Sequence, residues 1–262
     1  MFILYADEPK DPKEGESNFW IYGGIAVPAE SLAGLSETVR CIKCKFEIPP
    51  EVTLKLSRPK GFTCPQWPDA CGELVDEAIK ARCVGFITVT HRDVARSGKV
   101  KAYSMLRHAL FSRFNEFLMG TRSHGIAVLD NTEYKQDFKD INMLPLVGFN
   151  AGKKVVDLKR IHGYSVATEE SSPLLGLGDI FVGTFHRWVN VTRNLDDREK
   201  SLRRIARLLW RGQNDSGSLT LLRFGLDTRP WGQWNPELRK VCDRFVADVE
   251  SVAFSGDEPA SG

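Results

Sequence analysis

The chain opens with Met1-Phe2-Ile3-Leu4-Tyr5-Ala6-Asp7-Glu8, an apolar run that stops at two adjacent carboxylates. Its aromatic and β-branched residues predict a strand over 2–6. Such a strand would deliver Asp7 and Glu8 at its end, an arrangement from which many metal-dependent phosphoryl-transfer sites are built. The alternative interpretation is a turn before Pro9, because Asp favours turns.

The rest of the chain is predicted as a strand pair followed by alternating helices and strands. A second strand over 19–27 would form an antiparallel hairpin with the first. Further strands are predicted over 52–56, 83–90, 125–129 and 155–161. Apolar residues at helical spacing predict helices over 31–46, 69–81, 103–118, 134–146, 174–191, 196–210 and 237–252. This order predicts an α/β fold, with a mixed β-sheet flanked by helices.

Composition limits the class of protein without fixing its partner. With 262 residues, 42% of them hydrophobic, we expect one large domain over 1–195, a helical C-terminal extension over 196–254 and a disordered tail over 255–262. The 36 basic and 34 acidic residues nearly balance, so any basic surface must be local. The sequence shows no signal peptide and no run of about 18 apolar residues. We therefore expect a cytoplasmic protein without a membrane partner.

Two later apolar segments each carry a single aspartate, Asp130 and Asp179. Carboxylate oxygens are the ligands that Mg²⁺ and Mn²⁺ prefer, and two-metal sites hold their ions about 3.5–4 Å apart. Acids from separate segments must therefore converge on one small volume. We predict Asp7, Asp130 and Asp179 as catalytic metal ligands, and Glu8 as a further ligand or a base-positioning group.

The predicted helix around Asp179 is strongly apolar, and such a helix is largely buried. Helical steps place small or polar residues on one stripe: Gly176, Asp179, Gly183, His186 and Asn190. The glycines would allow a neighbouring strand or a metal to approach closely. The alternative is that this stripe faces solvent and that Asp179 is idle. For Asp130, the alternative is a strand-end residue that enters a turn.

A basic helix over 196–210 is the predicted contact for a nucleic-acid partner. Arg203, Arg204 and Arg207 lie on its outer side and would follow a phosphate backbone of RNA or DNA. The alternative is a solvated face whose arginines pair with Asp196, Asp197 and Glu199.

The cysteines offer a different kind of site. Cys41 and Cys44, together with Cys64 and Cys71, have the number of thiolates that a structural zinc site needs. Cys64 and Cys71 are seven positions apart, however, and Cys41 and Cys44 fall in a predicted helix. Reduced thiols are the favoured interpretation.

At the carboxylate segments the chain resembles the domain-of-unknown-function 3800 family, over residues 1 to about 192. That family opens with a strand ending in Asp-Glu-Ser-Gly, and here Tyr5-Ala6-Asp7-Glu8-Pro9 stands at that place. Its Gly-Gly second strand is similar to 19–27, and its middle strand ends in an aspartate, as 128–130 does. Its late signature, a Ser followed by Leu-Gln-Leu-Ala-Asp-Leu-Ile-Ala-Gly, is similar to 171–183, where Gly176 and Gly178 replace the Gln and the Ala.

The resemblance implies a ribonuclease H-like fold and metal-dependent nuclease activity. It also places Lys55, in Thr53-Leu54-Lys55, where the family tends to carry a Glu-x-Lys-like segment; here the acid is absent. Lys55 would steer phosphate, or it is an exposed strand lysine. Pro9-Lys10 replaces the family's Ser-Gly, which affects substrate detail more than metal binding.

We therefore expect a nuclease that hydrolyses phosphodiester bonds with two Mg²⁺ or Mn²⁺ ions. The alternative is a non-catalytic ribonuclease H-like module, of a defence or mobile-element system, that binds nucleic acid or protein. A zinc-stabilised structural protein is the third hypothesis.

Overall fold

The central sheet grows from the first strand of the chain. In the computed structural model, which describes residues 1–9, 19–93, 99–130, 148–151, 154–168, 172–190, 195–229 and 236–255, β1 (Phe2–Asp7) pairs antiparallel with β2 (Phe19–Pro28). The register runs from Phe2 opposite Pro28 to Asp7 opposite Gly23. The predicted hairpin is thereby confirmed.

Six strands form the sheet, in the order β10-β3-β2-β1-β4-β7. The remaining four are β3 (Val84–His91), β4 (Gly125–Asp130), β7 (Ile161–Ala167) and β10 (Leu226–Arg229). Strand β3 continues the antiparallel meander beside β2, whereas β4 runs parallel to β1 and β7 parallel to β4. The sheet is therefore mixed, as the sequence predicted.

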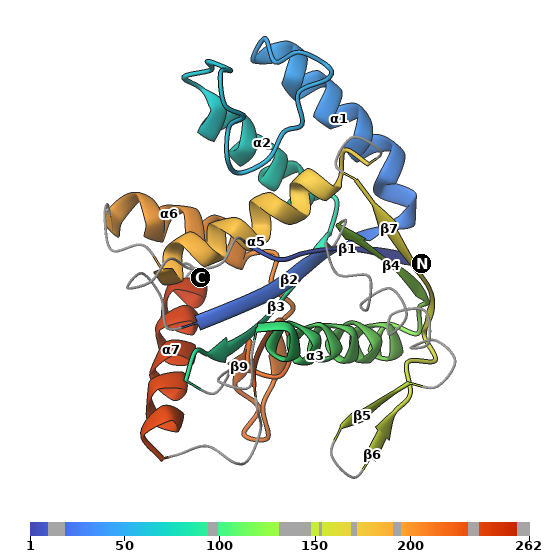
Figure 1. The fold of residues 1–262 in the computed structure, drawn as a ribbon, viewed down its shortest axis with the longest axis vertical. Coiled ribbons are helices and arrows are strands. Elements are labelled where there is room, and N and C mark those ends of the chain that lie inside the picture. The colour runs from blue at the N-terminus through green and yellow to red at the C-terminus, as the bar shows by residue number, and fades with distance from the viewer. Residues whose placement is uncertain are drawn as a thin grey trace, which may run out of the picture.

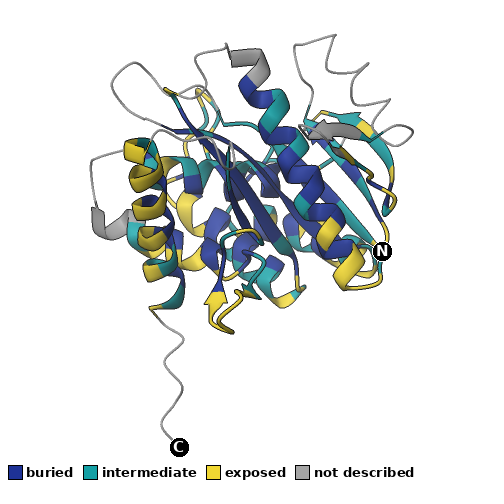
Figure 2. Ribbon diagram, turned by 90° about the horizontal axis from the view of Figure 1, so that it is seen from below, coloured by how far each residue is buried: buried dark blue, intermediate teal, exposed yellow. Residues whose placement is uncertain are grey.

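Helices cover both faces of this sheet (Figure 1). They are α1 (Leu32–Lys45), which follows a short 3-10 turn, η1 (Ala29–Ser31), then α2 (Trp67–Lys80), α3 (Lys99–Gly120), α5 (Leu175–Asn190), α6 (Leu195–Ala206) and α7 (Pro236–Phe254). Helix α3 packs on one face, in a core cluster that includes Leu4, Phe86 and Leu129. The other five α-helices share the core cluster of the opposite face. Figure 2 shows the resulting buried strands between helices whose outer sides are exposed.

Most predicted elements are confirmed to within a few residues, but two strand predictions are wrong. Residues 52–56 form an irregular segment, because their backbone groups bind side chains of α2 and α5 instead of a neighbouring strand. The predicted strand over 155–161 is split by a turn into β6 (Lys154–Val156) and β7, and β6 pairs with β5 (Phe149–Ala151). The predicted helix over 134–146 lies outside the described residues.

Residues 196–254 contribute more than helices. After α6 ends, Leu208 accepts a hydrogen bond from the backbone of Gly85 at 2.7 Å, and the chain then enters a small hairpin of β8 (Gly212–Gln213) and β9 (Leu219–Thr220). Strand β10 pairs in parallel with β3 from Leu226 to Arg229. This segment therefore extends the central sheet. Residues 256–262 lie outside the described part of the chain.

Among the helices that the structure describes, none has both the length and the apolar character that a membrane crossing requires.

Candidate metal and phosphate site

Asp7 and Asp130 lie side by side at one edge of the sheet. Strands β1 and β4 are parallel, with Ala6 beside Leu129, and the next residue on each strand is an aspartate. Ala6 and Leu129 both point into the core under α3. Because side chains alternate along a strand, Asp7 and Asp130 both point to the opposite face. Neighbouring strands are about 4.8 Å apart, so the two carboxyl groups belong to the same small region.

Asp179 reaches this region from α5, which covers that face. The helix packs tightly on β1 at Gly178, where an added Cβ would come within 3.2 Å of the carbonyl oxygen of Tyr5. Leu177 and Phe181, which flank this position, are fully buried in the core of that face, whereas Asp179 is half-buried. The structure thus brings three of the predicted carboxylates to one edge of the sheet from three separate elements.

The stripe of small residues on α5 accommodates the segment 52–57. A Cβ at Gly176 would overlap the carbonyl oxygen of Leu54, and one at Gly183 would come within 2.6 Å of the Leu56 side chain. The close approach predicted for these glycines therefore exists, and its partner is an irregular segment. Of the two interpretations of the stripe, packing is correct for its glycines.

This segment also holds Asp179 in place. The backbone N–H of Leu56 donates to Asp179 Oδ2 at 2.7 Å. The preceding carbonyl, that of Lys55, accepts from Trp67 Nε1 at 2.8 Å and from Cys71 Sγ at 3.4 Å. Helix α2 therefore fixes the segment, and the segment orients the carboxylate. Leu56 had no recognisable signal in the sequence, because any residue except proline supplies a backbone N–H.

The carboxylates interact electrostatically. The pKa of Asp7 is raised well above its usual value, first by burial, then by the charge of Asp179 and then by that of Asp130. The backbone N–H of Glu8, which donates to Asp7 Oδ1 at 2.7 Å, opposes this shift. Asp130 and Asp179 are therefore each close enough to repel Asp7, although the three residues belong to different elements.

Glu8 has a smaller effect on this group. Its charge is the weakest of the causes that raise the pKa of Asp7. Burial raises the pKa of Tyr22, and the charge of Glu8 adds to this rise. The Tyr22 ring lies in the core on the α3 side, and its hydroxyl interacts with Arg107. Arg107 is buried, 5.6 Å from the Tyr22 ring. The charge of Glu8 thus acts on both Asp7 and Tyr22.

Two basic side chains flank the carboxylates. Lys55 is half-buried and directly precedes the residue that binds Asp179. Arg187, two helical turns after Asp179, is exposed and donates from Nη2 to Ser57 Oγ at 3.1 Å. Arg187 was not predicted from the sequence, although its spacing of eight residues from Asp179 places it near the same side of the helix.

Two of the three arginines predicted to contact nucleic acid form ion pairs within the protein. Arg203 pairs with Glu199 at 2.6 Å, as the solvated-face alternative expects, and Arg204 pairs with Asp76 of α2 at 3.0 Å. Arg204 also lies so close to α2 that a Cβ at Gly72 would overlap its guanidinium. Arg207 is exposed. Arg204 therefore contributes to helix packing.

The donor set suits a hard divalent cation in its chemistry. All three aspartates offer oxygen, which Mg²⁺ and Mn²⁺ prefer. Within the described part of the chain, however, no three His, Cys, Asp or Glu side chains lie close enough together to hold one ion.

The zinc hypothesis finds little support among the cysteines, all six of which are described as free thiols. Cys41 and Cys44 are exposed on α1, whereas Cys64 and Cys71 are buried. Burial, with a smaller contribution from Asp179, raises the pKa of Cys71 to about 12. Because zinc binds thiolates, this shift opposes zinc binding at Cys71.

Comparison of the chain with known proteins finds no match to a protein-family model, to a curated protein or to a solved structure. The likeness to the domain-of-unknown-function 3800 family thus rests on the short motifs alone.

Proposed function

We propose that this protein is a divalent-metal-dependent nuclease with a ribonuclease H-like fold. The observation that carries the proposal is the convergence of Asp7, Asp130 and Asp179 on one edge of a mixed sheet, where burial, and after it the charges of Asp179 and Asp130, raise the pKa of Asp7. Clustered carboxylates are costly to keep ionised unless a cation neutralises them. Perturbed carboxyl groups of this kind are concentrated at functional sites.

To hold one or two Mg²⁺ or Mn²⁺ ions, Asp7, Asp130 and Asp179 would draw closer together than they lie in the structure. Glu8 would serve as a further ligand or as a group that positions a base. A bound ion would supply an activated water and stabilise charge on the leaving oxygen. The chain's own residues orient the site. The Leu56 N–H fixes the Asp179 carboxylate, and Lys55 and Arg187 carry the positive charge that attracts a phosphate group.

A nuclease panel tests this proposal. Single-stranded and double-stranded RNA and DNA, and an RNA–DNA hybrid, are incubated with Mg²⁺ or Mn²⁺ and wild-type protein, Asp7→Asn or Asp179→Asn. We expect cleavage of at least one substrate, and a loss of about 100-fold or more in each variant, since water activation contributes about 10²–10⁴-fold. The matched control is Asp243→Asn, which removes an exposed carboxylate from α7.

Thermal unfolding with and without Mn²⁺ separates binding from chemistry. We expect Mn²⁺ to raise the Tm of the wild type and not that of Asp179→Asn, because only a ligand that binds the folded state stabilises it. Metal binding without cleavage of any substrate would favour the non-catalytic module. No metal-dependent change in Tm and no cleavage would reject the metal site.

A further inference from the structure

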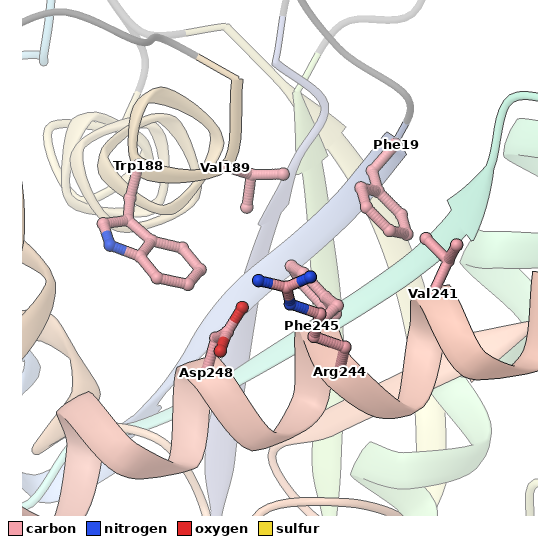
Figure 3. Close-up of a pocket in the computed structure, with 7 residues that line it drawn as sticks. All are labelled: Phe19, Trp188, Val189, Val241, Arg244, Phe245 and Asp248. Atoms are coloured by element: carbon pink, nitrogen blue, oxygen red, sulfur yellow. The ribbon is translucent and has the colours of Figure 1, made fainter.

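A groove lies between α5 and α7 (Figure 3), and none of the predicted metal ligands lines it. It has a volume of about 330 Å³ and is lined by Phe19, Trp188, Val189, Val241, Arg244, Phe245 and Asp248. This volume lies at the lower end of the range for small-ligand sites, about 300–1,000 Å³, and accommodates a planar ring system.

Aromatic rings from three elements form the groove. Phe19 of β2 and Phe245 of α7 stack with ring centroids 4.6 Å apart and an interplanar angle of 28°. Trp188 of α5 stands 6.4 Å from Phe245 and is tilted by 49° against it. The result is an apolar wall held by a strand and two helices, in which Phe19 and Phe245 are buried and Trp188 is the half-buried ring. Such a wall suits a flat aromatic ligand, because offset stacking is favourable.

Two charged side chains at the groove determine which polar groups a ligand needs. Figure 3 shows the guanidinium of Arg244 and the carboxylate of Asp248 directed toward the aromatic residues. Both residues are exposed, and within the described ranges no ion pair joins either of them to another side chain. The arginine is therefore available to an anion, while the aspartate accepts hydrogen bonds from amino groups. A ligand with a ring, amino groups and a nearby negative charge satisfies all three features.

We infer that this groove binds an unpaired base of single-stranded nucleic acid, with Arg244 on an adjacent phosphate. The inference rests on the proposed nuclease function and extends it to a substrate class. Trp188 follows Asp179 by nine residues on the same helix, which is about 13–14 Å at about 1.5 Å per residue. This distance corresponds to about four steps of a stacked strand, at about 3.4 Å each. A base paired within a duplex is not free to enter the groove.

Binding is measured by fluorescence anisotropy with a labelled oligonucleotide of about 10 nucleotides, within the usual site sizes of about 4–16. EDTA in the buffer prevents cleavage, and DNA, RNA and a matching duplex are compared. We expect Trp188→Leu to weaken single-strand binding by about 5-fold or more, since it removes a stacking face. Trp188→Phe keeps an aromatic ring and should retain most of the affinity.

The charge at the groove is tested by salt dependence. Arg244→Gln should reduce the slope of log affinity against log salt by about 1, which corresponds to one lost phosphate contact. Arg239→Gln is the matched control, because it removes the same charge from an exposed position of the same helix. Val241→Glu places a negative charge at the groove from an exposed position and should also weaken binding, so the test does not depend on Trp188 variants that fail to fold.

The inference is overturned if wild-type protein does not bind single strands, or if Trp188→Leu, Arg244→Gln and Val241→Glu all bind as the wild type does. It is also overturned if Trp188→Leu instead abolishes binding of a labelled peptide with an aromatic residue. Binding that depends on the groove, without cleavage in Mg²⁺ or Mn²⁺, would reject the nuclease and retain the groove. Cleavage that Trp188→Leu leaves unchanged would reject the groove as a substrate site and retain the nuclease.

Discussion

At the scale of single residues, the carboxyl group of Asp7 links folding to function. Burial and the charges of Asp179 and Asp130 raise its pKa in the folded chain. Between the unfolded pKa, about 3.9, and this higher folded pKa, the folded state binds more protons than the unfolded state. The free energy of unfolding therefore falls as pH rises through this window, and the whole penalty is present above it.

Replacing Asp7 by Asn should consequently stabilise the protein when divalent ions are absent. Asn keeps an oxygen that accepts the Glu8 N–H and carries no charge. In EDTA at pH 7–8 we expect a higher Tm than in the wild type, by a few degrees, since about 1 kcal/mol corresponds to about 2–4 °C for a chain of this size. The difference should shrink as pH approaches about 4. Thermal unfolding over a pH series measures it.

Asp243→Asn, at an exposed position, should show no such pH-dependent gain. A Tm of Asp7→Asn equal to or below that of the wild type at pH 7–8 would contradict the repulsion. Saturating Mn²⁺ should reverse the order of the two proteins, because the cation binds the site that the wild type retains.

The sequence indicated the residues of the site better than their supports. Asp7 and Asp130 could be predicted because each ends an apolar run, and a strand end is a local pattern. Asp179 could be predicted because it interrupts an apolar helix. The role of the Leu56 N–H could not be predicted, because a backbone donor has no residue type. The in-register pairing of β1 with β4 could not be predicted either, because it joins segments more than a hundred residues apart.

At the scale of elements, the contact between α5 and the segment 52–57 positions Asp179. Gly176 meets the carbonyl oxygen of Leu54 and Gly183 meets the Leu56 side chain, so the helix and the segment touch along the side that carries the carboxylate. The alternating apolar residues of this segment led to the wrong prediction of a strand. Leu54 is buried by packing under the helix. The alternation of apolar residues in this segment therefore reflects burial under the helix and not pairing in a sheet.

Gly176→Ala should loosen this contact. The added Cβ overlaps backbone, which cannot rotate away, so we expect a loss of about 1–3 kcal/mol in the free energy of unfolding. The shift of the segment 52–57 should also reduce the rise in Tm that Mn²⁺ causes. Thermal unfolding with and without Mn²⁺ measures both effects.

Gly34→Ala is the matched control within another helix. Gly34 lies exposed in α1, and no atom stands within 4 Å of its added Cβ. Alanine should stabilise this helix by about 0.5–1 kcal/mol, because glycine loses more conformational freedom on folding. Equal effects of the two substitutions would show that the contact at Gly176 has no role of its own.

At the scale of the whole molecule, the segment 196–254 completes the sheet. Strand β10 pairs with β3, and its Asp227 is fully buried between Arg113 at 3.3 Å and Arg229 at 2.9 Å. The sequence Leu-Asp-Thr-Arg carries no apolar pattern, so no strand was predicted there. Its burial depends on an arginine of α3, which lies more than a hundred residues earlier in the chain.

A chain that ends at Leu195 should therefore fail to fold cooperatively. It lacks β10, which covers β3, and the buried side chains of Leu202, Ile205, Phe245 and Val249, which belong to the core around α5. Burying each of these contributes about 1.5–3 kcal/mol, and domains are stable by only about 5–15 kcal/mol in total. We expect aggregation or a broad thermal transition, with exposed apolar surface that binds a hydrophobic dye. A chain that ends at Ser255 keeps all described elements and should unfold like the full protein; a sharp transition of the shorter chain at the full protein's Tm would instead establish residues 1–195 as an independent domain.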